Sequence, residues 1–202
     1  MSSTRGAPSN AGPRPLAPVS RPDLDAVERQ LGRPARGVAA VAHRCPCGQP
    51  DVLRTEPRLP DGSPFPTTYY ATCPRLTGAI STLETDGVMR SMTARLADDA
   101  SLAAGYRRAH EHYLAKRSEL GEVAEIAGVS AGGMPTRVKC LHVLVAHSLA
   151  AGPGVNPLGD EALEMLGEWW TPTSCAQLLS DTQTGAQPSS SQNQESGGSD
   201  DD

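Results

Sequence analysis

The residues best suited to chemistry are five cysteines and five histidines, and two of the cysteines stand one residue apart in 43-HRCPCGQPDV-52. Pro46 and Gly48 favour a tight turn there. A tetrahedral zinc site takes four Cys or His ligands, often two from one turn. The CPCG turn is one residue shorter than the usual CPxCG turn, so Cys45 and Cys47 are hard to place on one metal. The turn predicts part of a zinc site, with at least one of these thiolates as a ligand.

Further ligands are expected from two predicted helices. Cys73 precedes Pro74, a residue favoured in the first turn of a helix, so Cys73 is expected at the N-cap, where backbone N–H groups stabilise a thiolate. Residues seven apart share a helix face, whereas residues two apart do not. Cys140 and His147 are therefore expected to share a site, and Cys140 and His142 are not. The predicted metal ligands are Cys45, Cys47, Cys73, Cys140 and His147, and zinc is the metal they suit.

The same residues allow two other interpretations. With Cys73 as nucleophile and His142 or His147 as base, the protein would be a cysteine-dependent enzyme. Alternatively, the cysteines only pack in the core, because free cysteine is among the most buried residue types. Cys175 falls outside all three interpretations.

A second constellation, 131-AGGMPTRVK-139, suits an anion. Helix N-termini bind anions through unpartnered N–H groups, and neighbouring glycines let a phosphate approach the backbone. The spacing is not that of a P-loop, so nucleotide hydrolysis is not expected. Nearby arginines would either converge on this pocket or form ion pairs at the surface. The predicted anion-binding residues are Arg44, Arg54, Arg58, Arg75, Gly132, Gly133, Thr136, Arg137 and Lys139.

Apolar periodicity and turn residues predict the elements that position these side chains. Helices are expected at 23–32, 76–84, 88–119 (one helix or two), 135–152 and 160–169, and strands at 38–43, 51–56 and 67–73. The first two strands form a hairpin with Cys45 and Cys47 at its tip. His110 and His112, within a charged helix, are expected on a solvated face. The fold predicted is a helix-rich α+β domain with a small antiparallel sheet.

Composition divides the chain into three parts. Residues 1–20 are rich in Pro, Ser, Gly and Ala, and residues 181–202 are polar, acidic and of low complexity. Neither segment buries enough apolar surface to offset the entropy of ordering, so both are expected to be disordered tails. Residues 21–180 are expected to form a single globular domain.

Charge and hydropathy exclude some functions. The formal net charge is −5, and the acidic tail accounts for it, so the remainder is close to neutral. Nucleic-acid binding is not expected, because it needs an excess of Lys and Arg. No apolar run is long enough for a membrane span or a secretory signal. With an odd number of cysteines, these features favour a cytoplasmic protein with reduced thiols.

Four segments together resemble the bacterial family called domain of unknown function 501. They are 44-RCPCGQPDV-52, 63-SPFPTTYYATCPRL-76, 132-GGMPTRVKCLHVLVAHSLA-150 and 156-NPLGDEAL-163, and the resemblance spans about residues 23–170. It implies no particular activity. The function expected first is a binding or regulatory domain for a small anionic or phosphorylated ligand. The alternatives are the cysteine-dependent enzyme and a metal-stabilised interaction module; the sequence does not identify protein partners.

Overall fold

The computed structural model describes residues 18–171 and residue 175. The elements are α1 (Arg21–Leu31), β1 (Val38–Arg44), β2 (Pro50–Thr55), β3 (Tyr69–Ala71), α2 (Pro74–Thr85), α3 (Val88–Asp98), α4 (Ala100–Ser118), a 3-10 turn (Ala124–Ile126), α5 (Leu141–Ala151) and α6 (Pro157–Leu166). The helix-rich α+β fold with a small antiparallel sheet is therefore confirmed. The predicted tails lie outside the described residues, apart from residues 18–20. No described helix is long and apolar enough to cross a bilayer.

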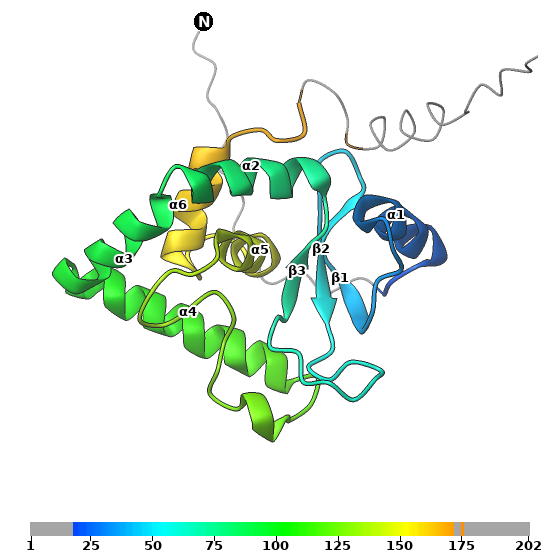
Figure 1. Cartoon of the computed structure of the whole chain (residues 1–202), viewed down its shortest axis with the longest axis horizontal. Coiled ribbons are helices and arrows are strands. Elements are labelled where there is room, and N and C mark those ends of the chain that lie inside the picture. The colour runs from blue at the N-terminus through cyan, green and yellow to red at the C-terminus, as the bar shows by residue number, and fades with distance from the viewer. Residues whose placement is uncertain (1–17, 172–174, 176–202) are drawn as a thin grey trace, which may run out of the picture.

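The sheet has the order β1-β2-β3, with antiparallel pairing throughout. The central strand β2 is buried along its whole length, because both faces of the sheet are covered. Successive side chains of a strand point to opposite faces. Val52 accordingly packs in the main core, whereas Leu53 packs with Val27 of α1 and Val41 of β1. Helix α1 thus covers one face of the sheet, as Figure 1 shows, and α5 lies on the other side.

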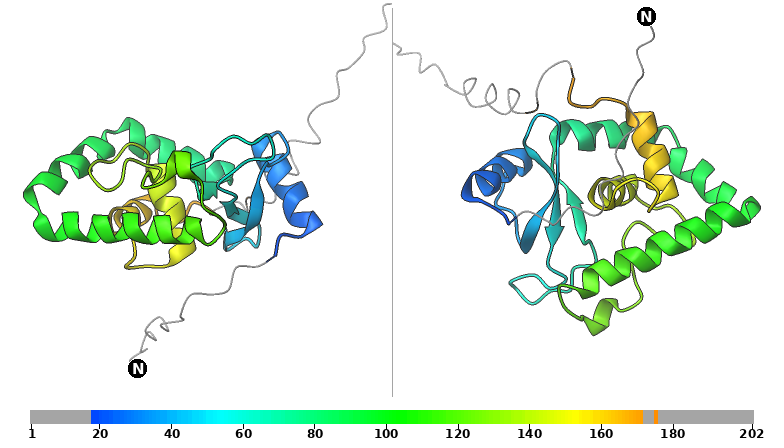
Figure 2. Two further views of the ribbon diagram at one scale, coloured as in Figure 1. Left: turned by 90° about the horizontal axis from the view of Figure 1, so that it is seen from below. Right: turned by 180° about the vertical axis from the view of Figure 1, so that it is seen from behind.

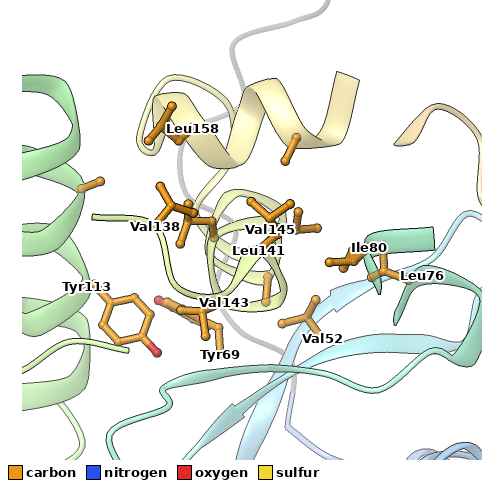
Figure 3. Packing of buried hydrophobic residues seen from close by; sticks show 14 of the residues in the cluster. Val52, Tyr69, Leu76, Ile80, Tyr113, Val138, Leu141, Val143, Val145 and Leu158 are labelled. Carbon is orange, nitrogen blue, oxygen red and sulfur yellow. The ribbon is translucent and has the colours of Figure 1, made fainter. Parts of the chain in front are cut away.

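Helix α5 runs through the middle of the molecule, between the sheet and helices α2, α3, α4 and α6 (Figures 1 and 2). Its sequence, LHVLVAHSLAA, is apolar around most of its circumference, which is typical of a helix buried on all sides. Val52 and Tyr69 of the sheet and Leu76 and Ile80 of α2 approach it in Figure 3. Helix α5 is therefore held in place by several elements, and its start carries one of the two side-chain groups described below.

Two predicted helix boundaries differ from the structure. The helix expected at 135–152 begins only at Leu141, because residues 132–139 fold into a loop closed by the hydrogen bonds from Arg137 N to Gly133 O (3.1 Å) and from Lys139 N to Gly132 O (2.8 Å). The last helix spans 157–166 rather than 160–169, and the Asn156 side chain caps its start. The segment 88–119 forms two helices, since Asp99 ends α3 and caps α4 through the Leu102 N–H.

Candidate functional site

Cys45 and Cys47 lie in the turn that joins β1 and β2. The turn is closed by a hydrogen bond from Gly48 N to Cys45 O (2.8 Å), followed by one from Cys45 N to Gln49 O (3.0 Å). Pro46 occupies the position of the turn where a fixed φ is favoured. The predicted hairpin is confirmed, and its short turn holds the two sulfur atoms close to each other and to Cys175.

Four of the five cysteines meet at one place, which we call the four-cysteine cluster: Cys45, Cys47, Cys73 and Cys175. The Sγ of Cys175 lies 3.4 Å from that of Cys73 and 3.9 Å from that of Cys45. The sulfurs of Cys45, Cys47 and Cys175 all lie within 4.8 Å of one another. Cys45, Cys73 and Cys175 are 1–3% exposed, and Cys47 is half-buried. The cluster joins the hairpin tip, the start of α2 and the chain beyond α6.

The elements explain how these thiols come together. Cys73 is the N-cap of α2, as the sequence predicted, with extended backbone. Arg75, in the first turn of the same helix, donates hydrogen bonds to the carbonyl oxygens of Trp169 (2.6 Å) and Thr171. These bonds bring the chain after α6 back to the start of α2. Cys175 follows four residues later and so reaches Cys73.

Burial and mutual proximity set the protonation of the cluster. Burial raises the pKa of Cys45 to about 11, although a backbone hydrogen bond from Cys47 opposes the rise. Burial and the neighbouring thiols, Cys73 first among them, raise the pKa of Cys175. Burial also acts on Cys47, but hydrogen bonds from the Gln49 backbone and from the Cys45 and Cys175 thiols outweigh it and lower its pKa. Three thiolates within 4.8 Å of one another, with a fourth beside Cys175, would need a cation to balance their charge.

Cys140 belongs to a second group, with Glu84 at the end of α2 and His142 in the first turn of α5. The ligand atoms of these three residues lie within 4.8 Å of one another. His142 Nδ1 lies 3.2 Å from Glu84 Oε1, and the same oxygen accepts the Leu141 N–H at 2.6 Å. Because α2 rises 1.5 Å per residue, Glu84 is about 16 Å along the helix from Cys73. Cys140 is therefore not a member of the four-cysteine cluster.

The expectation that Cys140 and His142 point apart assumed a regular helix. Cys140 is instead the extended N-cap residue of α5 (φ −157°, ψ 114°), so its side chain can turn toward His142. The hydrogen bond to Cys140 is the main reason that the pKa of His142 rises to about 9; burial opposes the rise, and Glu84 adds to it. His142 is thus an imidazolium at neutral pH. Both residues line a cleft of about 620 Å³ between α2, β3 and the end of α1.

His147 lies elsewhere, fully buried in the core. Its Nε2 is 2.9 Å from Nδ1 of His112, and its Nδ1 is 3.3 Å from the amide nitrogen of Asn156. The ring stacks on Tyr69 and meets Tyr113 edge-on. Both ring nitrogens are therefore engaged within the core, away from the cysteines. Among the described residues, His147 joins neither group that could hold a metal.

The histidines expected on a solvated face of α4 are turned inward. His112 bonds His147, as above, and His110 Nδ1 lies 2.9 Å from the hydroxyl of Ser130. Burial is the first cause that lowers the pKa of each. The charged sequence around them concealed this inward face, because the neighbouring Arg and Glu residues dominate the pattern.

The arginines proposed for anion binding do not converge. Arg44 makes a two-bond ion pair with Asp23 (2.7 and 2.9 Å), and this pair lowers the pKa of Asp23 to about 2. Arg54 pairs with Glu119 (2.8 Å). Arg58 pairs with Glu125 (2.8 Å), and Arg75 holds the carbonyls described above. Arg44, Arg54 and Arg58 therefore form ion pairs, which is the alternative that the sequence left open.

Residues 132–139 also differ from the expected anion site. Thr136, Arg137 and Lys139 precede α5 rather than forming its first turn. Gly132 and Gly133 have φ values of 77° and 92°, and a Cβ on Gly133 would meet Arg137 O at 2.7 Å. These glycines are thus required by the loop itself. The N-terminus of α5 already receives a carboxylate, that of Glu84, at the Leu141 N–H.

Comparison with known proteins identifies a family. A family model described as "Protein of unknown function (DUF501)" matches residues 41–164, which is more than half of the chain. No curated protein and no solved structure matches. The matched residues include Cys45, Cys47, Cys73, Cys140 and His142, whereas Cys175 lies outside them.

Proposed function

Because the chain belongs to the DUF501 family, whose description assigns no activity, we propose a function from the geometry alone: the protein is a zinc-binding domain whose metal is held by the four-cysteine cluster. The observation that carries this proposal is the group of three mutually close sulfurs, those of Cys45, Cys47 and Cys175, with the sulfur of Cys73 beside that of Cys175. Zn–S bonds of about 2.3 Å in a tetrahedron place the sulfurs about 3.8 Å apart. The distances from Cys175 to Cys73 and Cys45 are 3.4 and 3.9 Å.

The donor set supports zinc over other metals. Thiolates are soft ligands that select zinc or iron–sulfur chemistry, and a site closed by four cysteines is typical of structural zinc. With four protein ligands no position remains for substrate. The metal would therefore stabilise the fold and would not take part in a reaction.

The position of the cluster indicates what the metal would stabilise. It would tie the hairpin tip to the N-terminus of α2 and to Cys175, which is 102 residues beyond Cys73. Metal-binding free energy is folding free energy when the site does not exist in the unfolded chain. The protein would then be the metal-stabilised module among the alternatives. Reduced thiols also support the expected cytoplasmic location.

The other expected functions have less support. Cys73 is 1% exposed and enclosed by the cluster, so a substrate would not reach it. Binding of a small anionic or phosphorylated ligand at Arg137 and Lys139 stays a prediction. Isothermal titration with phosphate and pyrophosphate, comparing the wild type with Arg137→Ala, tests it.

The experiment for zinc is elemental analysis of untagged protein, together with thermal unfolding. The wild type should carry about one zinc per chain, and Cys73→Ser and Cys175→Ser should lose both zinc and stability. Cys140→Ser is the matched control and should keep its zinc. A wild type without metal, or a Cys73→Ser variant with the full zinc content, would overturn the proposal.

A further inference from the structure

The second group, Glu84, Cys140 and His142, is independent of the four-cysteine cluster and opens onto the cleft. Its three members come from the end of α2 and the start of α5, two elements in direct contact. Cys140 and His142 are each half-buried, and both line the cleft. A thiol, an imidazole and a carboxylate whose ligand atoms lie within 4.8 Å of one another, the first two at a cleft wall, are the parts of a nucleophilic cysteine site.

We propose that Cys140 is the nucleophile of an acyl-transfer site, with His142 as general acid and base, Glu84 as the residue that positions the His142 ring, and an uncharged acyl ester or thioester as substrate in the cleft.

The carboxylate geometry favours this role over a second metal site. Glu84 Oε1 already interacts with two groups, the Leu141 N–H at 2.6 Å and His142 Nδ1 at 3.2 Å. The first bond fixes the carboxylate to the backbone of α5. The second fixes the plane of the imidazole relative to that backbone. An oxygen so engaged orients the ring, which is the task of the third member of a cysteine or serine triad.

The chemistry of the cleft indicates the kind of substrate. Its volume of about 620 Å³ suits a small molecule. The described residues that line it include no Asp, Glu, Lys or Arg, and the one ionic group, the His142 imidazolium, is paired with Glu84, so a strongly charged ligand would lack a free partner. The wall carries hydroxyl residues instead, Tyr70, Thr77 and Ser81 among them. These groups suit an uncharged substrate that accepts and donates hydrogen bonds.

The start of α5 also offers donors for a developing oxyanion. The first N–H groups of a helix have no partner within the helix. That of Leu141 is taken by Glu84, while His142 and Val143, the next two residues, both line the cleft. Backbone N–H groups in this position stabilise the negative oxygen of a tetrahedral intermediate.

The reaction needs no further reagent than water. The Cys140 thiolate attacks the carbonyl carbon; a C–S bond forms, and the π electron pair moves to the oxygen. When the pair returns, the bond to the leaving alkoxide or thiolate breaks, and the leaving group takes the proton of the His142 imidazolium. Neutral His142 then removes a proton from water, and the hydroxide attacks the thioester. The C–S bond breaks, the acid leaves, and the thiolate and imidazolium are restored.

Acylation by p-nitrophenyl acetate and by an acetyl thioester, read per cysteine by mass spectrometry, tests the proposal on zinc-retaining protein. Both probes should acetylate Cys140 in the wild type, and only the ester should release nitrophenolate. His142→Gln should slow this step by about 100-fold or more, the usual contribution of general acid and base catalysis. The control His43→Gln changes another histidine with a carboxylate partner, Asp51 at 2.8 Å, and should leave the rate unchanged.

The variant Glu84→Gln distinguishes a role of Glu84 in positioning His142 from a role in folding alone. Glutamine can still accept the Leu141 N–H, but its neutral amide no longer favours the imidazolium. The alkaline limb of the pH–rate profile should therefore move to lower pH, an effect that a purely structural residue would not have. Iodoacetamide provides a second readout, because it should alkylate Cys140 faster in the wild type than in His142→Gln.

Three results would overturn the proposal. The first is acetylation and alkylation that both occur at another cysteine or not at all. The second is an unchanged rate in His142→Gln together with an unchanged pH profile in Glu84→Gln. The third is a second zinc ion per chain that Cys140→Ser removes, which would make this group a metal site. Loss of zinc from Cys73→Ser alone bears on the four-cysteine cluster and leaves this test intact.

Discussion

The two histidines of α5 should give stability contributions of opposite pH dependence. Burial, with a smaller effect of His112, lowers the pKa of His147 to about 3. An unfolded histidine has a pKa of about 6.5. Between these values the unfolded chain binds a proton that the folded protein does not, so stability falls as the pH decreases. The slope from this residue is about 1.4 kcal/mol per pH unit, or about 2.7 kcal/mol between about pH 6 and pH 4.

His142 behaves in the opposite way. Its pKa is raised to about 9, mainly by the hydrogen bond to Cys140 and by Glu84 against the effect of burial. A raised pKa contributes stability that is fully present below about pH 6.5 and is lost as the pH rises through about 9. Exposure to solvent screens part of this effect. The sign of the dependence is therefore the useful quantity, and its size is expected to be smaller than that of His147.

Urea unfolding of the wild type, His147→Gln and His142→Gln across the pH range measures both effects. Subtracting each variant from the wild type removes the titration of groups that they share. The difference in unfolding free energy between the wild type and His147→Gln should change by about 1.4 kcal/mol per pH unit on the acid side. The difference between the wild type and His142→Gln should decline only on the alkaline side. If the unfolding free energies of the wild type and His147→Gln run parallel between about pH 4 and pH 6, the lowered pKa of His147 is refuted.

Two further predictions concern packing and surface charge. A Cβ at position 159 would meet Leu144 O and Ser148 Oγ, so Gly159→Ala should lower the free energy of unfolding by about 1–3 kcal/mol. Gly78→Ala, which has open space around it, should stabilise α2 by up to about 1 kcal/mol. Equal changes in the thermal unfolding of the two variants would contradict the contact at position 159. Arg44→Ala should lower the free energy of unfolding by about 1 kcal/mol at neutral pH. It should also reduce the loss of stability below about pH 4, because the pKa of Asp23, about 2 in the wild type, would return toward its usual value. Acid unfolding curves of the variant and the wild type that coincide would contradict this prediction.

Local patterns predicted the parts of the site that depend on neighbours in the chain. Pro46 and Gly48 indicated the hairpin turn, and Pro74 indicated that Cys73 caps α2; both features are present. Cys175 could not be assigned in the same way. Its contact with Cys73 spans 102 residues, and the polar segment around it carries no periodic pattern. The available signal was the unassigned fifth cysteine, which would have completed a set of four thiols.

The second group was missed for a different reason. Pro135 fits the first position of a helix, and this placed Cys140 and His142 inside a regular helix where they point apart. The loop of residues 132–139 depends on hydrogen bonds of Gly132 and Gly133 to residues further on, which a periodic pattern does not reveal. Glu84 was overlooked because its bond to Leu141 N is a contact between helices distant in sequence. A helix boundary six residues away from its predicted place thus changed which side chains meet.

The most direct test of the zinc proposal is X-ray absorption at the zinc edge of the purified protein. Four cysteine ligands should give a single shell of four sulfurs at about 2.3 Å, with no nitrogen or oxygen at about 2.0–2.1 Å. The same spectrum of Cys175→Ser should show fewer sulfurs or no bound zinc. A mixed shell that contains nitrogen, in a wild type whose spectrum does not change in Cys175→Ser, would contradict the assignment of the metal to these four residues.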